Sequence, residues 1–331
     1  MPRFLRLTLL TSFFLLVSSI YFPIFATDFT FSLSPSFGIK SGGKGEYVFL
    51  KDCSYTDDKL SYLEWNFKNP YVALETDMGY KAFSIENKVS YGFGAFTDTM
   101  TDSDWQNVYF SELDNCQYKT NYSESDNFTK RDVSVNTKIS YSFFPLEWFC
   151  IKPLFALDFE YMRFVAKDGK YYYGKQYGYF YYRYDDSENN KTGSFSGDVL
   201  YYRRWSFFTW FGFGAKARLF DKISLEADIL VSPYSFAFDI DTHCLTSTRY
   251  IDIIESSFKS YKLSLSLITP LAAKSEIGLN FSFLYSALSR GKTYSKDLNS
   301  RFSKYLQDTS SECGMDEKTF NISLFYKFYL F

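Results

Sequence analysis

Apolar and polar side chains alternate with a period of two over several long segments of this chain. In segment 133–143 the odd positions are mostly apolar and the even positions polar: Val133, Val135, Thr137, Ile139, Tyr141 and Phe143 against Ser134, Asn136, Lys138, Ser140 and Ser142. Segments 88–95, 260–267 and 276–285 repeat this alternation. Because successive side chains of a β-strand point to opposite faces, each segment is predicted to be a strand with one apolar face.

The first 26 residues have a different pattern. Arg3 and Arg6 precede an apolar run from Leu7 through Phe25, and Ala26 stands before polar Thr27. A basic start, an apolar middle and a small residue at the end are typical of a secretory signal peptide. We therefore expect residues 1–26 to be removed on export. The mature chain, residues 27–331, has no apolar stretch long enough to predict a spanning helix.

The alternating segments are predicted to close into a transmembrane barrel. A soluble β-sandwich would show the same alternation, but the export signal and an aromatic content of 22% favour an outer-membrane barrel. Short connections are expected near Lys81, Pro145–Glu147, Asp221 and Ala272–Ser275, and long polar ones near Lys51–Asp58, Thr97–Asp132, Asp185–Ser196, His243–Tyr250 and Arg290–Lys318. Counting strands between these breaks predicts an all-β, ten-stranded antiparallel barrel with long extracellular loops and both termini on the periplasmic side.

Charge and composition exclude several kinds of partner. Without Arg3 and Arg6 the 36 basic residues fall to 34 against 38 acidic ones, a net charge of −4, which gives no reason to expect nucleic acid. No glycine-rich nucleotide loop or cofactor motif is present. Charged residues at inward positions are expected to pair across the lumen and disfavour an open pore: Lys138, Glu226, Asp228, Lys262 and Glu276. We expect a monomer without a cofactor.

The candidate chemistry centres on the single histidine, His243. It ends the acidic run Asp239-Ile240-Asp241-Thr242-His243, and a second acidic pair, Asp102 and Asp104, lies far upstream. One imidazole beside a carboxylate is the obvious candidate for proton transfer near neutral pH. A solvated surface loop is the plain alternative for either motif taken alone.

The acidic run would point the wrong way on a regular strand. Asp239, Asp241 and His243 share their odd parity with the apolar set that includes Ile223, Leu225 and Ile229. A change of register must turn them inward, and Pro233 is its natural position, because proline within a strand marks a bulge or an edge.

Motifs spread along the whole mature chain resemble those of the omptins, the ten-stranded outer-membrane proteases. They are Ser41-Gly42-Gly43-Lys44-Gly45-Glu46-Tyr47-Val48, Lys59-Leu60-Ser61-Tyr62-Leu63-Glu64-Trp65, Met100-Thr101-Asp102-Ser103-Asp104-Trp105 and Phe238-Asp239-Ile240-Asp241-Thr242-His243. The resemblance implies a peptide hydrolase in the cell outer membrane whose active site faces the exterior. Its partners would be outer-membrane lipid and polypeptide substrates with basic residues.

The resemblance also implies a role for each matching residue. His243 would be the general base, oriented by Asp241, and Asp102 would hold the attacking water with support from Asp104. These roles suit peptide hydrolysis, which needs an activated water and an acceptor for its proton. Glu46 and Asp239 would line a pocket for a basic side chain, with charge-assisted hydrogen bonds favouring arginine.

Three rivals to this chemistry remain open from the residues. Cys244 follows His243 directly, but neighbours on an extended strand point to opposite sides and do not make a Cys–His pair. A metal could be held by the Asp-x-Asp-x-His cluster, although zinc usually takes more nitrogen or sulfur ligands. A catalytically inactive barrel that acts as an adhesin or binding protein would keep the same fold.

The chain departs from the omptin pattern after the first acidic pair. The usual serine- and histidine-containing segment is replaced by the acidic stretch 111–127. Candidates for the pocket on the leaving-group side are therefore Glu112, Asp114, Glu124 and Asp126.

The resemblance extends to lipid. Arg163 and Arg204 fall near two positions of the basic patch that holds lipopolysaccharide phosphates on the outer wall of omptins. Lipopolysaccharide is thus a candidate activator.

The five cysteines predict disulfides in an exported protein. Cys53, Cys116, Cys244 and Cys313 fall in expected outer loops, and Cys150 is left over. Three pairings are open. Barrel closure favours Cys53 with Cys313, which leaves Cys116 with Cys244.

Overall fold

The structure is a computed structural model that describes residues 28–51, 58–94, 96–106, 118–178, 180–219, 222–300 and 303–331. The expected signal peptide therefore lies outside the described residues. The strands are β1 (Phe29–Leu50), β2 (Lys59–Tyr80), β3 (Phe83–Gly92), β4 (Thr97–Asp104), β5 (Asn121–Tyr141), β6 (Phe143–Leu146), β7 (Phe149–Gly174), β8 (Gln176–Tyr177), β9 (Phe180–Tyr181), β10 (Asn190–Leu219), β11 (Ile223–His243), β12 (Thr248–Ser256), β13 (Ser260–Ala272), β14 (Ser275–Asp297), β15 (Leu306–Gln307) and β16 (Ser311–Tyr329). Across these ranges no helix is long and apolar enough to span a membrane.

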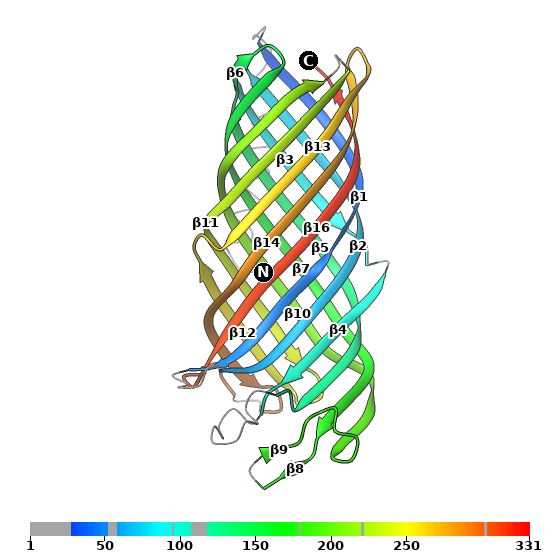
Figure 1. The fold of residues 1–331 in the computed structure, drawn as a ribbon, viewed down its shortest axis with the longest axis vertical. Coiled ribbons are helices and arrows are strands. Elements are labelled where there is room, and N and C mark those ends of the chain that lie inside the picture. The colour runs from blue at the N-terminus through cyan, green and yellow to red at the C-terminus, as the bar shows by residue number, and fades with distance from the viewer. Residues whose placement is uncertain are drawn as a thin grey trace.

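The main strands form a closed antiparallel barrel with ten positions around the ring, as predicted (Figure 1). Pairing of β1 with β16 closes the ring. Two positions are shared by successive strands: β3 and β4 both lie between β2 and β5, and β12 and β13 both lie between β11 and β14.

The connections differ in length at the two ends of the barrel. One end, the turn end, has tight turns such as the one at Lys81 between β2 and β3, and the backbone N–H of Leu330 donates to the carbonyl of Phe31 there at 2.9 Å. The start of β1 and the end of β16 therefore lie side by side at the turn end. The opposite, loop end carries the longer connections, and the β8–β9 hairpin projects beyond it (Figure 1).

An exposed apolar belt surrounds the half of the barrel next to the turn end. Its side chains alternate with inward ones that are mostly polar, as the sequence predicts, although Trp210 and Leu230 point into a buried apolar cluster. Examples are Phe37, Val72, Leu74, Ile85, Val89, Ile139, Phe211, Phe213, Ile229, Leu263, Leu265, Leu279, Phe281, Ile322 and Leu324. Such a belt fits the hydrocarbon region of a bilayer, because closed strand pairing leaves no unsatisfied backbone group facing lipid.

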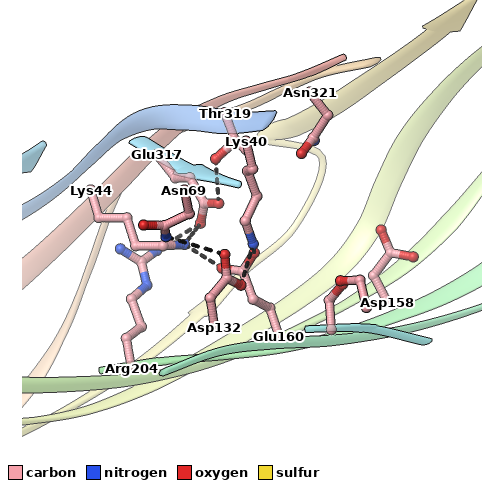
Figure 2. A network of polar contacts seen from close by, with 12 residues as sticks. Lys40, Lys44, Asn69, Asp132, Asp158, Glu160, Arg204, Glu317, Thr319 and Asn321 are labelled. Carbon is pink, nitrogen blue, oxygen red and sulfur yellow. Dashed lines mark hydrogen bonds and ion pairs between the residues drawn. The ribbon is translucent and has the colours of Figure 1, made fainter. Parts of the chain in front are cut away.

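Ion pairs cross the lumen of the barrel. Figure 2 shows Lys40 and Lys44, both from β1, reaching the carboxylates of Asp132, Glu160 and Glu317. The Nζ of Lys44 lies 2.5 Å from Glu160 Oε1 and 2.8 Å from Glu317 Oε2, and its side chain is fully buried. We call these five residues the lumen network. Nearer the turn end Lys138 pairs with Asp228 at 3.2 Å, and Lys262 pairs with Asp158 at 2.7 Å.

Register shifts separate the apolar belt from the loop-end half of several strands. On β11, Val231 pairs with Phe211 but Tyr234 pairs with Thr209, so β11 carries one extra residue at Ser232–Pro233. The Ser232 hydroxyl donates to the carbonyl of Tyr234 at 2.8 Å across this bulge. Ile229 on the belt side is 66% exposed, whereas Asp239, of the same sequence parity, is completely buried. The register change predicted at Pro233 is thus confirmed, and it turns the acidic run inward.

Candidate active site

The loop end of β11 brings the single histidine onto an aspartate. Nε2 of His243 lies 2.5 Å from Oδ2 of Asp241, two residues earlier on the same inward face. Asp241 is almost fully buried, whereas the imidazole is 28% exposed. The ring of Tyr250, on β12, meets the imidazole edge-on with centroids 5.3 Å apart. The histidine is therefore held at the mouth of the barrel with one nitrogen bound and part of its ring accessible.

A second pair of carboxylates lies on β4. Asp102 and Asp104 pair with Leu63 and Ser61 of β2 and with Ser123 and Asn121 of β5. The side-chain amide of Asn121 donates to Asp104 Oδ2 at 3.3 Å. Oδ1 of Asp102 is buried and has no hydrogen-bond partner among the described residues. Asp104 is thus anchored, and Asp102 keeps an oxygen for another group.

The β4 pair and the β11 pair act on each other electrostatically. Burial works to lower the pKa of His243, but the charge and contact of Asp241, with the charges of Asp102 and Asp104, raise it to about 9. Burial and then the charge of Asp104 raise the pKa of Asp102 to about 8, against the opposing effect of His243. Asp104 ends β4 and His243 ends β11, so the four residues predicted to be catalytic lie at the same end of the barrel and their charges act on one another.

A second acidic cluster lies beside the first. Glu46 of β1, Asp239 of β11 and Asp252 of β12 each offer a carboxylate oxygen within 4.8 Å of the others, and all three are buried. Glu46 and Asp239 were predicted to share a pocket; Asp252 was not. Burial, followed by repulsion from neighbouring carboxylates, raises the pKa of Glu46 well above its usual range. Within the described part of the chain this is the group of acidic side chains placed to hold a metal ion, and it differs from the Asp-x-Asp-x-His set considered from the sequence.

Aromatic rings support the acidic cluster. The hydroxyl of Tyr202 donates to Asp239 Oδ2 at 2.9 Å. Its ring stacks on Trp65 with centroids 4.9 Å apart, and Trp65 stacks on Phe164 at 5.8 Å. These rings are fully buried and join the core cluster that includes Leu63 and Met100. The carboxylates are therefore fixed on a rigid, dry base.

The two leaving-group candidates that the structure describes do not point to the inside of the barrel. Glu124 and Asp126 have the outward parity of β5, while Ser123, Ser125 and Asn127 are buried on the inward face. That placement contradicts their expected role, and Glu112 and Asp114 lie outside the described residues. Burial and then the charges of Asp102 and Asp104 raise the pKa of the Tyr173 hydroxyl, on β7, to about 12.

The basic patch is only partly where it was expected. Arg204 is 3% exposed inside the barrel, 3.6 Å from Glu317, and donates to the carbonyl of Asp316, so its expected place on the outer wall is wrong. Its neighbour Arg203 is exposed instead. Arg131, Arg163 and Arg203 pair across β5, β7 and β10, which gives an arginine row on the outer face. A belt of rings, Tyr161, Trp205 and Phe238, lies on the turn-end side of this row.

The expected disulfides are not formed as predicted. Cys150, Cys244 and Cys313 carry free thiols. Cys313 is fully buried inside the barrel with Ala237, Ile254 and Met315, so the bridge to Cys53 is wrong. Cys244 is likewise free of the expected bridge to Cys116. Cys53 and Cys116 themselves lie outside the described residues.

Asp252 was not singled out from the sequence. Segment 243–250 was expected to be a long loop, but β11 ends at His243 and β12 begins at Thr248, which places Asp252 directly opposite Asp239. The aromatic and β-branched run Tyr250, Ile251, Ile253 and Ile254 around Asp252 was the available signal of a strand.

Similarity to known proteins extends over nearly the whole barrel. The family model described as the Omptin family matches residues 27–330. Among solved structures, the outer-membrane protease OmpT from Escherichia coli matches with a TM-score of 0.77 and 17% identity, over 93% of this chain and 99% of that one. OprG from Pseudomonas aeruginosa matches with a TM-score of 0.33 and 7% identity, over 90% and 95% of the two chains. The translocator domain of NalP from Neisseria meningitidis gives 0.32 and 8%, over 95% of each. No curated protein sequence matches significantly.

Proposed function

The chain belongs to the omptin family, and from that membership we propose that it is an outer-membrane endopeptidase that cleaves peptides after basic residues. The observation that carries the proposal is the 2.5 Å contact between Nε2 of His243 and Oδ2 of Asp241, at the same end of the barrel as Asp102, whose buried Oδ1 has no hydrogen-bond partner among the described residues. An imidazole held by a carboxylate and a second carboxylate with a free oxygen are the groups needed to deprotonate and orient one water.

The reaction would proceed by direct attack of water on the peptide carbonyl. Asp241 binds Nε2 of His243, so Nδ1 is the nitrogen available to take the proton. Asp102 would accept a hydrogen bond from the same water and orient it. The new carbon–oxygen bond forms as the proton moves to His243, and Asp241 stabilises the imidazolium. That proton then passes to the leaving amine as the carbon–nitrogen bond breaks.

The acidic cluster would supply the specificity. Glu46 and Asp239 are buried and carry carboxylate oxygens without partners among the described residues. An arginine or lysine side chain before the cleaved bond would neutralise them with charge-assisted hydrogen bonds. Such a side chain would reach the cluster from the loop end of the barrel.

The position in the membrane follows from the barrel. We place the turn end in the periplasm and the loop end, with the active site, at the cell exterior, as short turns and long loops are arranged in such barrels. Arg163, with Arg131 and Arg203, would then meet the phosphates of lipopolysaccharide at the outer surface. Lipopolysaccharide is therefore proposed as an activator, and the protein as a monomer.

One experiment tests the activity. The refolded protein is incubated with a mixed peptide library, with and without lipopolysaccharide, and cleavage sites are read by mass spectrometry. Cleavage after Arg and Lys that persists in a chelator and disappears in His243→Ala supports the proposal. Chelator-sensitive cleavage would indicate metal hydrolysis, and binding without cleavage would indicate an adhesin.

A further inference from the structure

The acidic cluster contains Asp252 in addition to the predicted pair Glu46 and Asp239. The geometry of the three carboxylates affects which basic side chain the cluster can bind. Asp239 and Asp252 face each other across β11 and β12, and Glu46 approaches from β1. Asp252 is 2% exposed. It is held by hydrogen bonds with Thr293 and with the thiol of Cys313. The third carboxylate is thus fixed by its own neighbours and does not depend on a ligand for its position.

Each member of the cluster keeps an oxygen without a partner. Glu46 Oε2, Asp239 Oδ1 and Asp252 Oδ1 are buried and make no hydrogen bond within the described ranges. The nearest cation acting on Asp239 is Arg204, which is itself engaged by Glu317 and the carbonyl of Asp316. Burial and then the charge of Asp252 raise the pKa of Asp239 well above its usual range. The cluster therefore lacks a positive partner that a substrate can supply.

The size of the cluster discriminates between cations. Three oxygens no more than 4.8 Å apart surround a point at most about 2.8 Å from each, which is the length of an N⁺–H···O⁻ hydrogen bond. An ammonium nitrogen at that point can donate to all three, because lysine has three donors on one atom. A guanidinium centred there, with C–N bonds of about 1.3 Å, would need its acceptors roughly 4 Å from the centre.

The cluster has little room to widen for a guanidinium. On its turn-end side lie Ala237, Ile254, Cys313 and Met315, a buried apolar cluster that cannot solvate a displaced carboxylate. Tyr202 fixes the other oxygen of Asp239 from β10. Resting on the proposed function, we propose that Asp252 makes the specificity pocket a three-carboxylate site for an ammonium group, so that cleavage after lysine is preferred to cleavage after arginine.

The test compares two peptides that differ only in Lys or Arg before the cleaved bond. For the wild type, kcat/KM should be higher for the lysine peptide. Asp252→Asn should lower the Lys/Arg ratio of kcat/KM about tenfold, the effect of one charge-assisted hydrogen bond. Glu255→Gln is the matched control, because it removes a carboxylate from the exposed outer face of the same strand. If Asp252→Asn does not fold, Asp252→Ser replaces it.

A binding measurement separates this inference from the proposed activity. The thermal unfolding midpoint is followed with n-butylamine and with n-butylguanidine, using wild type and Asp252→Asn. A larger midpoint shift with n-butylamine than with n-butylguanidine, lost in Asp252→Asn, supports the ammonium site. It does so even if neither peptide is cut; the absence of cleavage would then count only against the proposed protease activity. An unchanged Lys/Arg ratio and equal shifts for both ligands overturn the inference. A midpoint raised by calcium or zinc, and by neither amine, would instead make the cluster a metal site.

Discussion

Nε2 of His243 lies 2.5 Å from Oδ2 of Asp241 on the same face of β11, so the imidazole is oriented by its own strand. A pair built into one strand needs no second element to bring its members together. The bulge at Ser232–Pro233 then determines on which side of the barrel wall the pair lies.

Removal of the imidazole should nearly abolish cleavage without unfolding the barrel. We expect His243→Ala to lose about 10²–10⁴-fold in kcat, the usual contribution of a general base. Asp241→Asn should lose less, because the imidazole remains. Far-ultraviolet circular dichroism checks that both variants keep the strand content. Normal cleavage by His243→Ala would rule out its assignment as the base.

The pH dependence should follow the raised pKa of His243. Below about pH 9 the ring of the free enzyme is protonated and cannot accept a proton from water, so kcat/KM should rise with pH up to that value. After burial, which acts in the opposite direction, Asp241 is the largest cause and raises the pKa. Asp241→Asn should therefore move the rising limb to lower pH. A limb at the same pH in both enzymes would assign it to another group.

Neutralising the β1 carboxylate should weaken recognition of a basic side chain. Glu46→Gln keeps the shape of the residue but removes a buried charge, so kcat/KM for basic peptides should fall about tenfold or more. Thermal stability should change little or rise, because burial and repulsion already disfavour the ionised form of Glu46. Library cleavage sites without a basic residue would contradict the pocket itself.

Activation by lipopolysaccharide should depend on the arginine row. Arg163→Ala and Arg203→Ala should each raise the lipopolysaccharide concentration needed for half-maximal activity several-fold, because a phosphate loses a charge-assisted contact. Lys274→Ala is the control, because it removes one positive charge from the exposed turn between β13 and β14, at the turn end of the barrel and away from the arginine row. Full activity in detergent without lipopolysaccharide would show that no activation is required.

Thiol counting on the unfolded, unreduced protein should find at least three free thiols. Cys150, Cys244 and Cys313 account for these. A count of three would place a bridge between Cys53 and Cys116, and five would mean that no bridge forms. A count of one would show that at least two of Cys150, Cys244 and Cys313 are oxidised, which would contradict their free thiols in the structure.

The barrel could be predicted from sequence because its signal is local. Within the belt one face meets lipid and the other mostly meets the polar lumen, so residues such as Leu263 and Leu265 alternate with polar neighbours. Beyond the belt apolar side chains also occupy the inward face, as Leu63, Trp65 and Met100 do, and the regular alternation disappears although the strands continue. That loss put Cys313 in an expected loop.

The error at Arg204 has a related cause. Near it, rings occupy both faces of β10: Trp205 and Phe207 lie outside, and Phe208 and Trp210 lie inside. Because aromatic side chains occur on both faces of this part of β10, the sequence does not show which of Arg203 and Arg204 points inward. Only the pairing with β7 and β11 decides it. The spatial approach of Glu46, Asp239 and Asp252 depended in the same way on register between strands, which a single sequence does not specify.

The lumen network also has a consequence for the cell. Because Lys40, Lys44, Asp132, Glu160 and Glu317 form ion pairs across the lumen, the proposed hydrolysis at the mouth would open no route for solutes across the wall. Both fragments of a cut chain would then depart on the side from which the chain arrived. On the proposed function, a cell could display many copies of this protein without weakening its permeability barrier, and a protein far too large to be imported could still be cut.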